Sequence, residues 1–372
     1  MRKKKSAGAD GPSLKKRVGA LKGDIESLKN PSGYNGNDWG SAMQKPSSQL
    51  RLVKGRLSGK DIGNITQAKW GKGNQILTLT SGANSLTSLL VWDASLQIRT
   101  HLVLPEHQWL ICSGFEQKNG ILVASGGLDC ECSIYSLENA HNDPSAKAIA
   151  DLRQHDGYVA DLAFLDGGSK ILTASGDSQC ILWDVNTQIG TKVFSGHDGD
   201  VVGISVDPTN PSVFLSAGID NKIKAWDMRT DSNDCSSEFT LKKSLGEISN
   251  VSYHPNGKSF VLSAGEGSIV YDMKAAAVDA EGTTVPLLTF SGDKFDDDSS
   301  ECTMSKFSNS GRLLFSTYEG GTAVAHDTSS QESFCMTANR KNKVRAEFLD
   351  IHPEGYNLAL GNSQQVALIF HF

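Results

Sequence analysis

The sequence predicts an all-β fold in which a unit of short strands repeats seven times, and three observations predict it. The dipeptide Trp-Asp recurs along the 372-residue chain, a strand-like apolar run leads into it, and a turn containing Asp precedes it at a fixed distance. Repeats of about 40–45 residues that carry this dipeptide are typical of β-propeller blades. The sequence therefore predicts a seven-bladed WD-repeat β-propeller with a short N-terminal α-helix.

The dipeptide is complete in three copies and degenerate in four. The complete copies begin at Trp92, Trp183 and Trp226, and the degenerate ones at Tyr135, Tyr271, His326 and Phe370. The intervals between these seven positions are 43, 48, 43, 45, 55 and 44 residues. The longest interval holds a polar insertion at 295–301, which we expect to form a loop. The series predicts seven blades.

The repeats contain the pattern of a buried strand that ends at the aromatic anchor residue. The runs 89–92, 180–183 and 222–226 are rich in apolar and β-branched residues, as expected for strands buried between blades. A small-residue turn precedes three of the anchors, and in each case its Asp lies six residues before the anchor. These turn residues are Asp129, Asp177 and Asp220.

Two repeats carry the residues of a hydrogen-bonded tetrad known from WD blades, made of His, Asp, a hydroxyl and the Trp indole. The expected tetrads are His155, Ser175, Asp177 and Trp183, and then His197, Ser216, Asp220 and Trp226. A buried imidazole and a buried carboxylate need partners because desolvation is costly. We therefore interpret His155 and Asp177 as a structural pair and not as a catalytic one.

The chain divides into a basic N-terminal segment at 1–29, a linker at 30–49 and the propeller at 50–372. Five apolar residues of the first segment follow the heptad spacing of a coiled coil: Leu14, Val18, Leu21, Ile25 and Leu28. A helix this short needs a partner helix to bury that seam. The alternative is a disordered tail with accidental spacing. We expect residues 50–57 to form the outer strand of the last blade and so to close the ring.

Composition and charge exclude several classes of function. Residues 1–29 carry nine Lys or Arg against three Asp or Glu, so the rest of the chain, at an overall net charge of −6, is acidic. An acidic body argues against a nucleic-acid surface. Met1–Lys5 is basic without a following apolar region, so we expect no secretory signal and seven free cysteines in a reducing, cytoplasmic compartment.

No motif of an enzyme is present. The sequence contains no GxSxG, HExxH or P-loop pattern, and the spacing of Cys130 and Cys132 is not that of a zinc site. We therefore predict no catalytic residues, no metal and no cofactor. A protein-binding scaffold remains, and the fold alone does not say which one.

Four segments closely resemble the beta subunits of heterotrimeric G proteins. They are VASGGLDCECSIYSL at 123–137, HDGYVADLAFLDGGSKILTASGDSQCILWD at 155–184, GHDGDVVGISV at 196–206 and FSNSGRLLFSTY at 307–318. A heptad segment ahead of a seven-bladed ring is also that family's plan. The resemblance extends over nearly the whole chain and is strongest in the second, third and fourth blades.

The resemblance implies a binding face for a G-protein alpha subunit and for effectors. The contact residues that it implies are Trp109, Leu128, Tyr158 and Asp200, and on weaker matches Ile111, Val202 and Glu247. Large aromatic side chains ringed by acidic ones are typical anchors of an interface. The alternatives are that Trp109 packs within its blade and that Asp200 only forms a turn.

The chain departs from the family at four positions of that face. Asn64 and Thr66 stand where the family has Lys and Tyr, Cys130 replaces an Asn, and Ser363 replaces a Trp. These changes leave the choice of alpha subunit open.

The resemblance implies a beta subunit that pairs obligately with a gamma subunit through 14–28 and takes part in transmembrane receptor signalling. A lipid on the gamma subunit, aided by the basic N-terminus, would hold the pair at the inner face of the plasma membrane. The rival hypothesis is another WD-repeat scaffold, ribosome-associated or kinase-anchoring, a class that generally lacks the heptad segment.

Overall fold

The computed structural model describes the greater part of the chain beyond residue 50. The described ranges are 51–53, 64–81, 87–93, 98–103, 109–140, 147–230, 234–274, 278–279, 282–291, 301–319, 321–336, 346–353, 357–362 and 366–371. All of them lie in the second of two compact units, Pro46–Phe372, while the first unit is Met1–Lys45. The predicted helix at 14–28, the linker at 30–49 and Ser363 lie outside the described residues.

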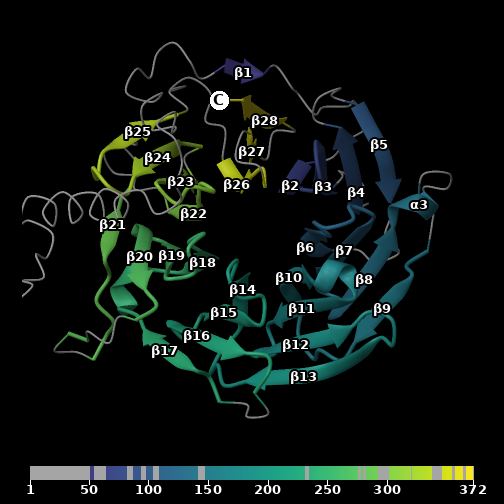
Figure 1. Cartoon of the computed structure of the whole chain (residues 1–372), viewed down its shortest axis with the longest axis horizontal. Coiled ribbons are helices and arrows are strands. Elements are labelled where there is room, and N and C mark those ends of the chain that lie inside the picture. The colour runs from purple at the N-terminus through teal and green to yellow at the C-terminus, as the bar shows by residue number, and fades with distance from the viewer. Residues whose placement is uncertain are drawn as a thin grey trace, which may run out of the picture. The chain divides into compact units, whose positions relative to one another are not determined.

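Seven four-stranded antiparallel sheets, here called blades 1 to 7, make up the described part of the second unit (Figure 1). Blade 1 contains β2 (Asn64–Trp70), β3 (Gln75–Ser81), β4 (Thr87–Asp93) and β5 (Ile98–Val103). Blade 2 contains β6 (Leu110–Phe115), β7 (Leu122–Gly127), β8 (Glu131–Ser136) and β9 (Ala150–Arg153). Blade 3 contains β10 (Val159–Leu165), β11 (Lys170–Ser175), β12 (Gln179–Asp184) and β13 (Ile189–Ser195).

The remaining blades follow in chain order. Blade 4 contains β14 (Val201–Val206), β15 (Val213–Gly218), β16 (Lys222–Asp227) and β17 (Ser237–Thr240). Blade 5 contains β18 (Ile248–Tyr253), β19 (Ser259–Ala264), β20 (Gly267–Asp272) and β21 (Leu288–Phe290). Blade 6 contains β22 (Cys302–Phe307), β23 (Leu313–Tyr318), β24 (Ala323–Asp327) and β25 (Ser333–Cys335). Blade 7 contains β26 (Ala346–Ile351), β27 (Asn357–Asn362), β28 (Val366–His371) and β1 (Arg51–Val53).

The fold prediction needs two corrections. Only six sheets, not seven, are formed by four strands that are consecutive in the sequence; the seventh repeat supplies three strands, and β1 from the other end of the propeller sequence completes its sheet. The closing strand was predicted at 50–57, and three of those residues pair, with Arg51 opposite His371. The one α-helix among the described residues is the single turn α3 (Leu137–Ala140), which no sequence pattern predicted; the N-terminal helix is not among these residues.

The inner strands form a closed ring. Each of β2, β6, β10, β14, β18, β22 and β26 contacts the inner strand of the next blade, and β26 contacts β2 (Figure 1). The core lies between neighbouring blades. One cluster, for example, joins Leu172 and Phe194 of blade 3 to Ile204, Phe214 and Trp226 of blade 4. Because both sheet faces are buried in this way, the third strands are near-continuous apolar runs, as the sequence predicted.

Every inner strand carries the same irregularity close to its start. The register against the second strand shifts within the first four residues of the inner strand in all seven blades, for example between Val159 and Asp161 and between Val201 and Gly203. Such a β-bulge leaves one extra residue unpaired and re-aims its side chain. In blades 2 and 4 the extra residues are Ile111 and Val202.

Candidate functional site

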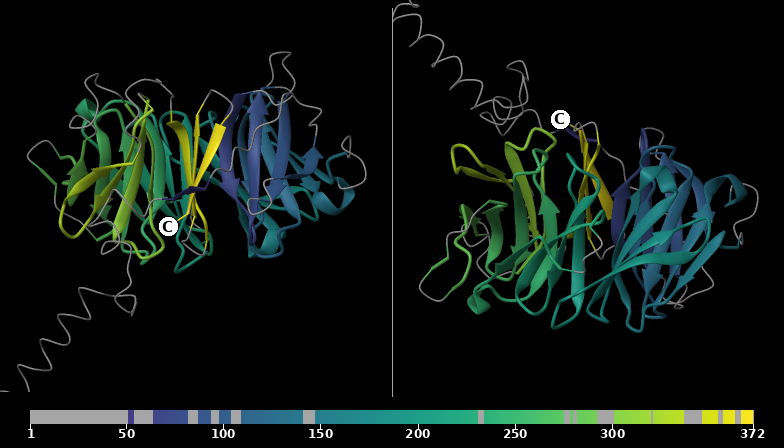
Figure 2. Two further views of the ribbon diagram at one scale, coloured as in Figure 1. Left: turned by 90° about the horizontal axis from the view of Figure 1, so that it is seen from above. Right: turned by 60° about the horizontal axis from the view of Figure 1, so that its bottom comes forward.

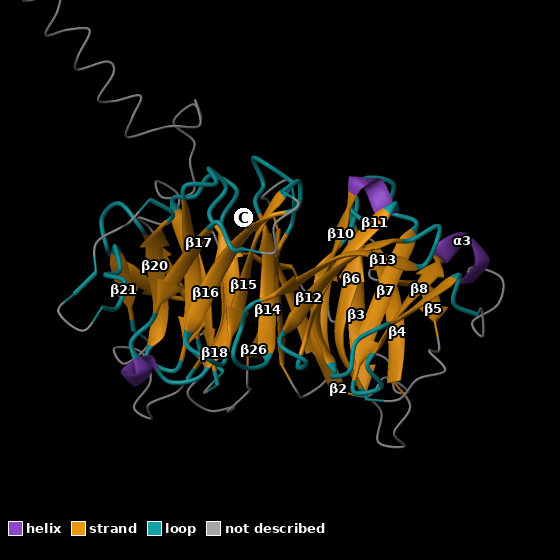
Figure 3. Cartoon of the chain, turned by 90° about the horizontal axis from the view of Figure 1, so that it is seen from below, coloured by secondary structure: helices purple, strands orange, loops and turns teal. Residues whose placement is uncertain are grey.

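The candidate site lies on the face of the ring at which the inner strands begin, here called the start face. Inner strands of neighbouring blades are joined at matching positions: Ser113 N donates to Gln67 Oε1 (2.7 Å), and Ile204 N to Asp161 Oδ2 (3.1 Å). They therefore run in the same direction, and the strands cross the ring from face to face (Figures 2 and 3). In antiparallel sheets the turn between the second and third strands lies on the same face.

On the start face, the position directly before the inner strand is described in five blades. Its occupants are Trp109, Tyr158, Asp200, Glu247 and Glu301. In four of the blades the carbonyl of this residue accepts a hydrogen bond from the turn between the second and third strands. The donors are Leu128 N to Trp109 (3.1 Å), Gly176 N to Tyr158 (2.9 Å), Ile219 N to Asp200 (3.0 Å) and Glu319 N to Glu301 (3.0 Å). The two loops of each of these blades are thus fastened together.

The blade 2 part of this face is apolar and exposed. The side chain of Trp109 is 66% exposed and that of Leu128 is 55% exposed, so Trp109 does not pack inside its blade. Trp109 has a φ of +68°, which a non-glycine residue seldom adopts. A Cβ on Gly127 would lie 2.3 Å from the Trp109 carbonyl oxygen, so only glycine allows this close approach. The backbone therefore holds a bulky aromatic side chain out in solvent.

The blade 3 and blade 4 parts are joined by their side chains. Tyr158 Oη donates a hydrogen bond of 2.9 Å to Asp200 Oδ2. Burial, together with the hydrogen bond to Asp200 and its negative charge, raises the pKa of Tyr158 above its usual value. The phenol therefore keeps its proton at neutral pH. Asp200 does more than form a turn, because it bridges two blades.

The weaker matches occupy the same face, two of them as bulge residues and Glu247 directly before β18. Ile111 is the bulge residue of blade 2 and is 39% exposed, while Val202 is the bulge residue of blade 4 and is partly buried. Glu247 is exposed and follows Gly246, whose φ is +78°. The structure thus brings all seven predicted contact residues to one face.

The structure describes the side chains at two of the four positions that differ from the resembled family, Thr66 and Cys130. Thr66 is the bulge residue of blade 1 and is exposed. Cys130 lies in the turn after Leu128 with a φ of +63°, partly buried. The side chain of Asn64 and the whole of Ser363 lie outside the described residues.

Sequence reasoning missed Ile219, which is 56% exposed and occupies in blade 4 the place that Leu128 has in blade 2. The signal was available, since Leu128 and Ile219 each directly precede a turn aspartate, Asp129 and Asp220.

Both tetrads lie directly beneath this face, and one of them needs correction. His155 Nδ1 is 2.7 Å from Asp177 Oδ2 and its Nε2 is 2.7 Å from the hydroxyl of Thr173, not of Ser175. Trp183 Nε1 donates to the same Thr173 hydroxyl (2.9 Å). Ser175 instead donates to Gly157 O (2.9 Å) and accepts from Asp177 N (3.1 Å). In the second tetrad the hydroxyl is the expected Ser216, 2.7 Å from His197 Nε2 and 2.8 Å from Trp226 Nε1.

The tetrads explain how the turns stay rigid. Asp177 also accepts from Asp156 N (3.1 Å) and Gln179 N (3.0 Å), so one carboxylate fixes two loops of the start face. Burial lowers the pKa of His155, although Asp177 opposes that effect. All polar atoms of the group are used in bonding within the blade, which leaves no nucleophile or base directed at solvent.

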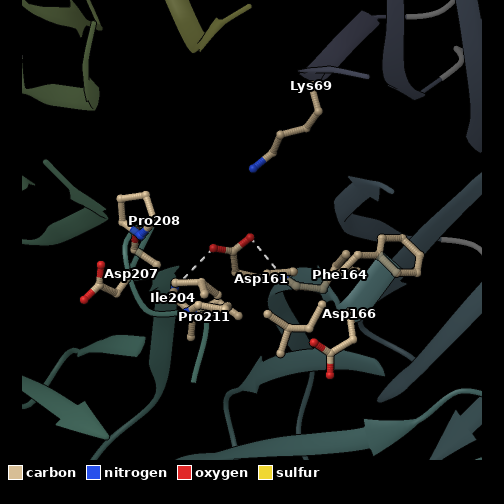
Figure 4. Close-up of a pocket in the computed structure, with 13 residues that line it drawn as sticks. Lys69, Asp161, Phe164, Asp166, Ile204, Asp207, Pro208 and Pro211 are labelled. Atoms are coloured by element: carbon tan, nitrogen blue, oxygen red, sulfur yellow. Dashed lines mark hydrogen bonds between the residues drawn. The ribbon is translucent and has the colours of Figure 1, made fainter. Parts of the chain in front are cut away.

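A shallow depression between blades 3 and 4 is the other candidate (Figure 4). Asp161 lies at its centre, and Lys69 points toward it from blade 1. The Asp161 carboxylate accepts from Ile204 N (3.1 Å) and Leu162 N (2.9 Å), so it joins two blades. Among the described residues no cluster of His, Cys, Asp and Glu could hold a metal ion. Within the same residues no helix is long and apolar enough to span a membrane.

Comparisons with known proteins point to one family. The model described as "WD domain, G-beta repeat" matches residues 146–184 and 188–227, which include both tetrads. A protein named guanine nucleotide-binding protein subunit beta from Oryza sativa subsp. japonica is 30% identical over 294 residues, covering 76% of this chain and 75% of that protein. Proteins of the same name from Zea mays and Arabidopsis thaliana are 29% identical over 294 residues and 33% identical over 249 residues, the latter covering 64% of this chain and 63% of that protein.

Proposed function

Because this chain belongs to the family of guanine nucleotide-binding protein beta subunits, we propose that it is the beta subunit of a heterotrimeric G protein that binds a GDP-loaded alpha subunit on its start face. As a WD-repeat member of that family it is a signalling scaffold and not an enzyme, which confirms the prediction from sequence.

The observation that carries the proposal is the composition of the start face. Trp109 and Leu128 offer exposed apolar surface, and Tyr158 and Asp200 lie beside them in the next two blades. Exposed aromatic side chains with a polar surround are the usual anchors of protein interfaces. Backbone hydrogen bonds fasten the loops that carry these residues, and tetrads brace the loops of blades 3 and 4, so little conformational entropy of the backbone is lost on binding.

The mechanism that follows is binding and release. The alpha subunit with GDP presents its switch region to the start face, and GTP reorders that region so that it no longer fits. The released beta subunit, with its gamma partner, then offers the same face to effectors. A rigid binding face suits two partners, the alpha subunit and an effector, that bind to it one after the other.

The heptad residues Leu14, Val18, Leu21, Ile25 and Leu28 would pair with a helical gamma subunit. A lipid on that partner would attach the pair to the inner face of the plasma membrane, with the basic residues 1–29 as a second signal. Vesicle binding that is insensitive to salt and to removal of residues 1–5 would contradict the role of the basic segment.

The central experiment compares two leucines of equal exposure. Leu128 on the start face and Leu287 on the perimeter of blade 5 are both 55% exposed, so Leu128→Ala and Leu287→Ala remove the same surface. Affinity purification from native membranes, with GDP or a non-hydrolysable GTP analogue, measures the alpha subunit retained. We expect Leu128→Ala and Trp109→Ala to weaken retention about tenfold or more, and Leu287→Ala to leave it unchanged.

The gamma partner supplies an internal control, since none of the three substitutions lies within residues 14–28. Retention of a GTPase that is equally strong with GDP and with the analogue, or equally weakened by all three variants, would contradict the proposal. Purification of ribosomal or kinase partners in its place would favour the rival scaffold.

A further inference from the structure

Tyr158 and Asp200 occupy equivalent positions in adjacent blades, yet their roles differ. Tyr158 directly precedes β10 and Asp200 directly precedes β14, and the hydroxyl of the first donates to the carboxylate of the second at 2.9 Å. The aromatic side chain is thus tied to a blade other than its own.

The ring of Tyr158 also lies close to a glycine of its own blade. A Cβ built on Gly176 would lie 2.4 Å from Tyr158 Cε1 and 2.7 Å from Cδ1, so the ring lies against the bare backbone there. Gly176 N also donates to the Tyr158 carbonyl (2.9 Å). Backbone, ring and hydroxyl of Tyr158 are therefore each held by a separate contact.

Asp200 is itself held independently of Tyr158. Its carbonyl accepts from Ile219 N (3.0 Å) in the turn of blade 4. The two turns that carry Gly176 and Ile219 are in turn braced by their tetrads. The backbone of Asp200 is therefore fixed without help from Tyr158, and its carboxylate reaches the Tyr158 hydroxyl from a fixed position in blade 4.

The direction of the hydrogen bond decides what the hydroxyl can offer to a guest. A tyrosine hydroxyl has one proton and two acceptor lone pairs. The one hydroxyl proton is donated in the hydrogen bond to the Asp200 carboxylate, so the free side of the hydroxyl can only accept a hydrogen bond. The group that meets it must be a donor, and a lysine or arginine side chain suits the neighbouring negative charge.

We infer that Asp200 is a positioning residue for Tyr158. Its carboxylate orients the Tyr158 side chain and makes the hydroxyl a hydrogen-bond acceptor, which selects a lysine or arginine side chain on the binding partner. This inference rests on the proposed function for the identity of the guest but not for the coupling of the two residues.

The coupling is tested on the free protein by ¹⁹F NMR after labelling with 3-fluorotyrosine, with the residue 158 signal assigned through Tyr158→Phe. Asp200→Asn keeps the shape but replaces the acceptor charge, and we expect it to shift and broaden that signal. Gly176→Ala should move it as well, because the added methyl group displaces the ring. Asp198→Asn, two residues away and 78% exposed at its side chain, is the matched control and should leave it in place.

The role in binding is tested by a double-mutant cycle with a purified GDP-loaded G-protein alpha subunit as the probe. Tyr158→Phe and Asp200→Asn should each weaken binding about five- to tenfold, and the double variant should be no more than about twofold weaker than either. Asp198→Asn should have little effect.

The outcomes separate the inference from the proposed function. An unmoved NMR signal in Asp200→Asn overturns the coupling, and additive losses in the cycle overturn the positioning role because Asp200 would then contact the guest directly. If the variants change the NMR signal as expected but the wild-type chain binds no alpha subunit, the proposed function is refuted and the coupling of Tyr158 and Asp200 stands.

Discussion

Asp350 in blade 7 accepts a hydrogen bond of 2.6 Å from the backbone N–H of Trp70 in blade 1, although the two residues are 280 positions apart. The other oxygen of the carboxylate pairs with Lys306 Nζ of blade 6 at 2.5 Å. His352 adds a bond from Nε2 to Gly73 O (2.6 Å), and its ring packs edge-on against Trp70. The ring is therefore closed by inner-strand side chains as well as by β1.

We expect Asp350→Ala to destabilise the protein by about 2–4 kcal/mol, because it leaves a buried backbone N–H and a partly buried lysine without their acceptor. Urea denaturation measures the change. Asp198→Ala removes a carboxylate from an exposed ion pair with Lys222 and should cost less than about 1 kcal/mol. Equal losses in the two variants would contradict a role for Asp350 in closure.

The anchor dipeptides predicted one strand in each blade, and all seven anchors lie in the third strand, where in blades 1 to 6 a buried aromatic ring packs between neighbouring sheets. Blade 7 was harder: β1 comes from the far end of the propeller sequence, and only its alternating pattern indicated the pairing with β28. Helix α3 carries no apolar periodicity, so no pattern could predict it.

Some residues of the candidate site could be identified from the local sequence, and others only from the three-dimensional structure. Trp109, Tyr158 and Asp200 could be found because the sequence around them resembles that of G-protein beta subunits, and the structure places each of them directly before an inner strand. The hydroxyl of the first tetrad could not be chosen by distance along the chain. Trp183 pairs with Ile171, so its indole reaches the diagonal neighbour Thr173 on the same sheet face, and Ser175 lies one step too far. The Tyr158–Asp200 bond joins two blades and has no local signal.

Thr173→Val tests the corrected tetrad. Valine keeps the shape but removes the oxygen that serves both His155 and Trp183, leaving two buried polar groups without partners. We expect a loss of about 2–4 kcal/mol in the free energy of unfolding. Thr191→Val on the outer strand of the same blade is the matched control and should change it by about 1 kcal/mol or less.

His326 should make blade 6 sensitive to acid. It occupies the anchor position that Trp183 has in blade 3, stacks on Phe290 with ring centroids 4.6 Å apart, and lies 2.8 Å through Nδ1 from Ser333 Oγ. Burial lowers its pKa to about 4. The folded state therefore favours the neutral imidazole, and the stability that this provides is complete above about pH 6.5 and is lost as the pH falls toward 4.

The measurement is the free energy of unfolding of wild type and His326→Phe at pH 7 and pH 5. Each pH unit below about 6.5 costs roughly 1.4 kcal/mol for this one group, so the drop in wild type should exceed that in the variant by about 2 kcal/mol. Other histidines with lowered pKa values, such as His155 and His254, remain in both proteins and cancel. An identical drop in both proteins would exclude His326 as the acid-sensitive group.

Glu116 should hold the first turn of blade 2 through its charge. The residue is buried, and its carboxylate accepts from three successive backbone N–H groups, those of Lys118 (2.6 Å), Asn119 (2.8 Å) and Gly120 (2.9 Å). Glu116→Gln turns one acceptor oxygen into a donor that faces those N–H groups, so we expect a loss of about 1–3 kcal/mol. Glu138→Gln, an exposed glutamate of α3, is the matched control. Hydrogen exchange locates the effect: because Asn119 Nδ2 also bonds Gly167 O of blade 3, protection should fall in both turns, and a loss spread evenly over the ring would contradict a local role.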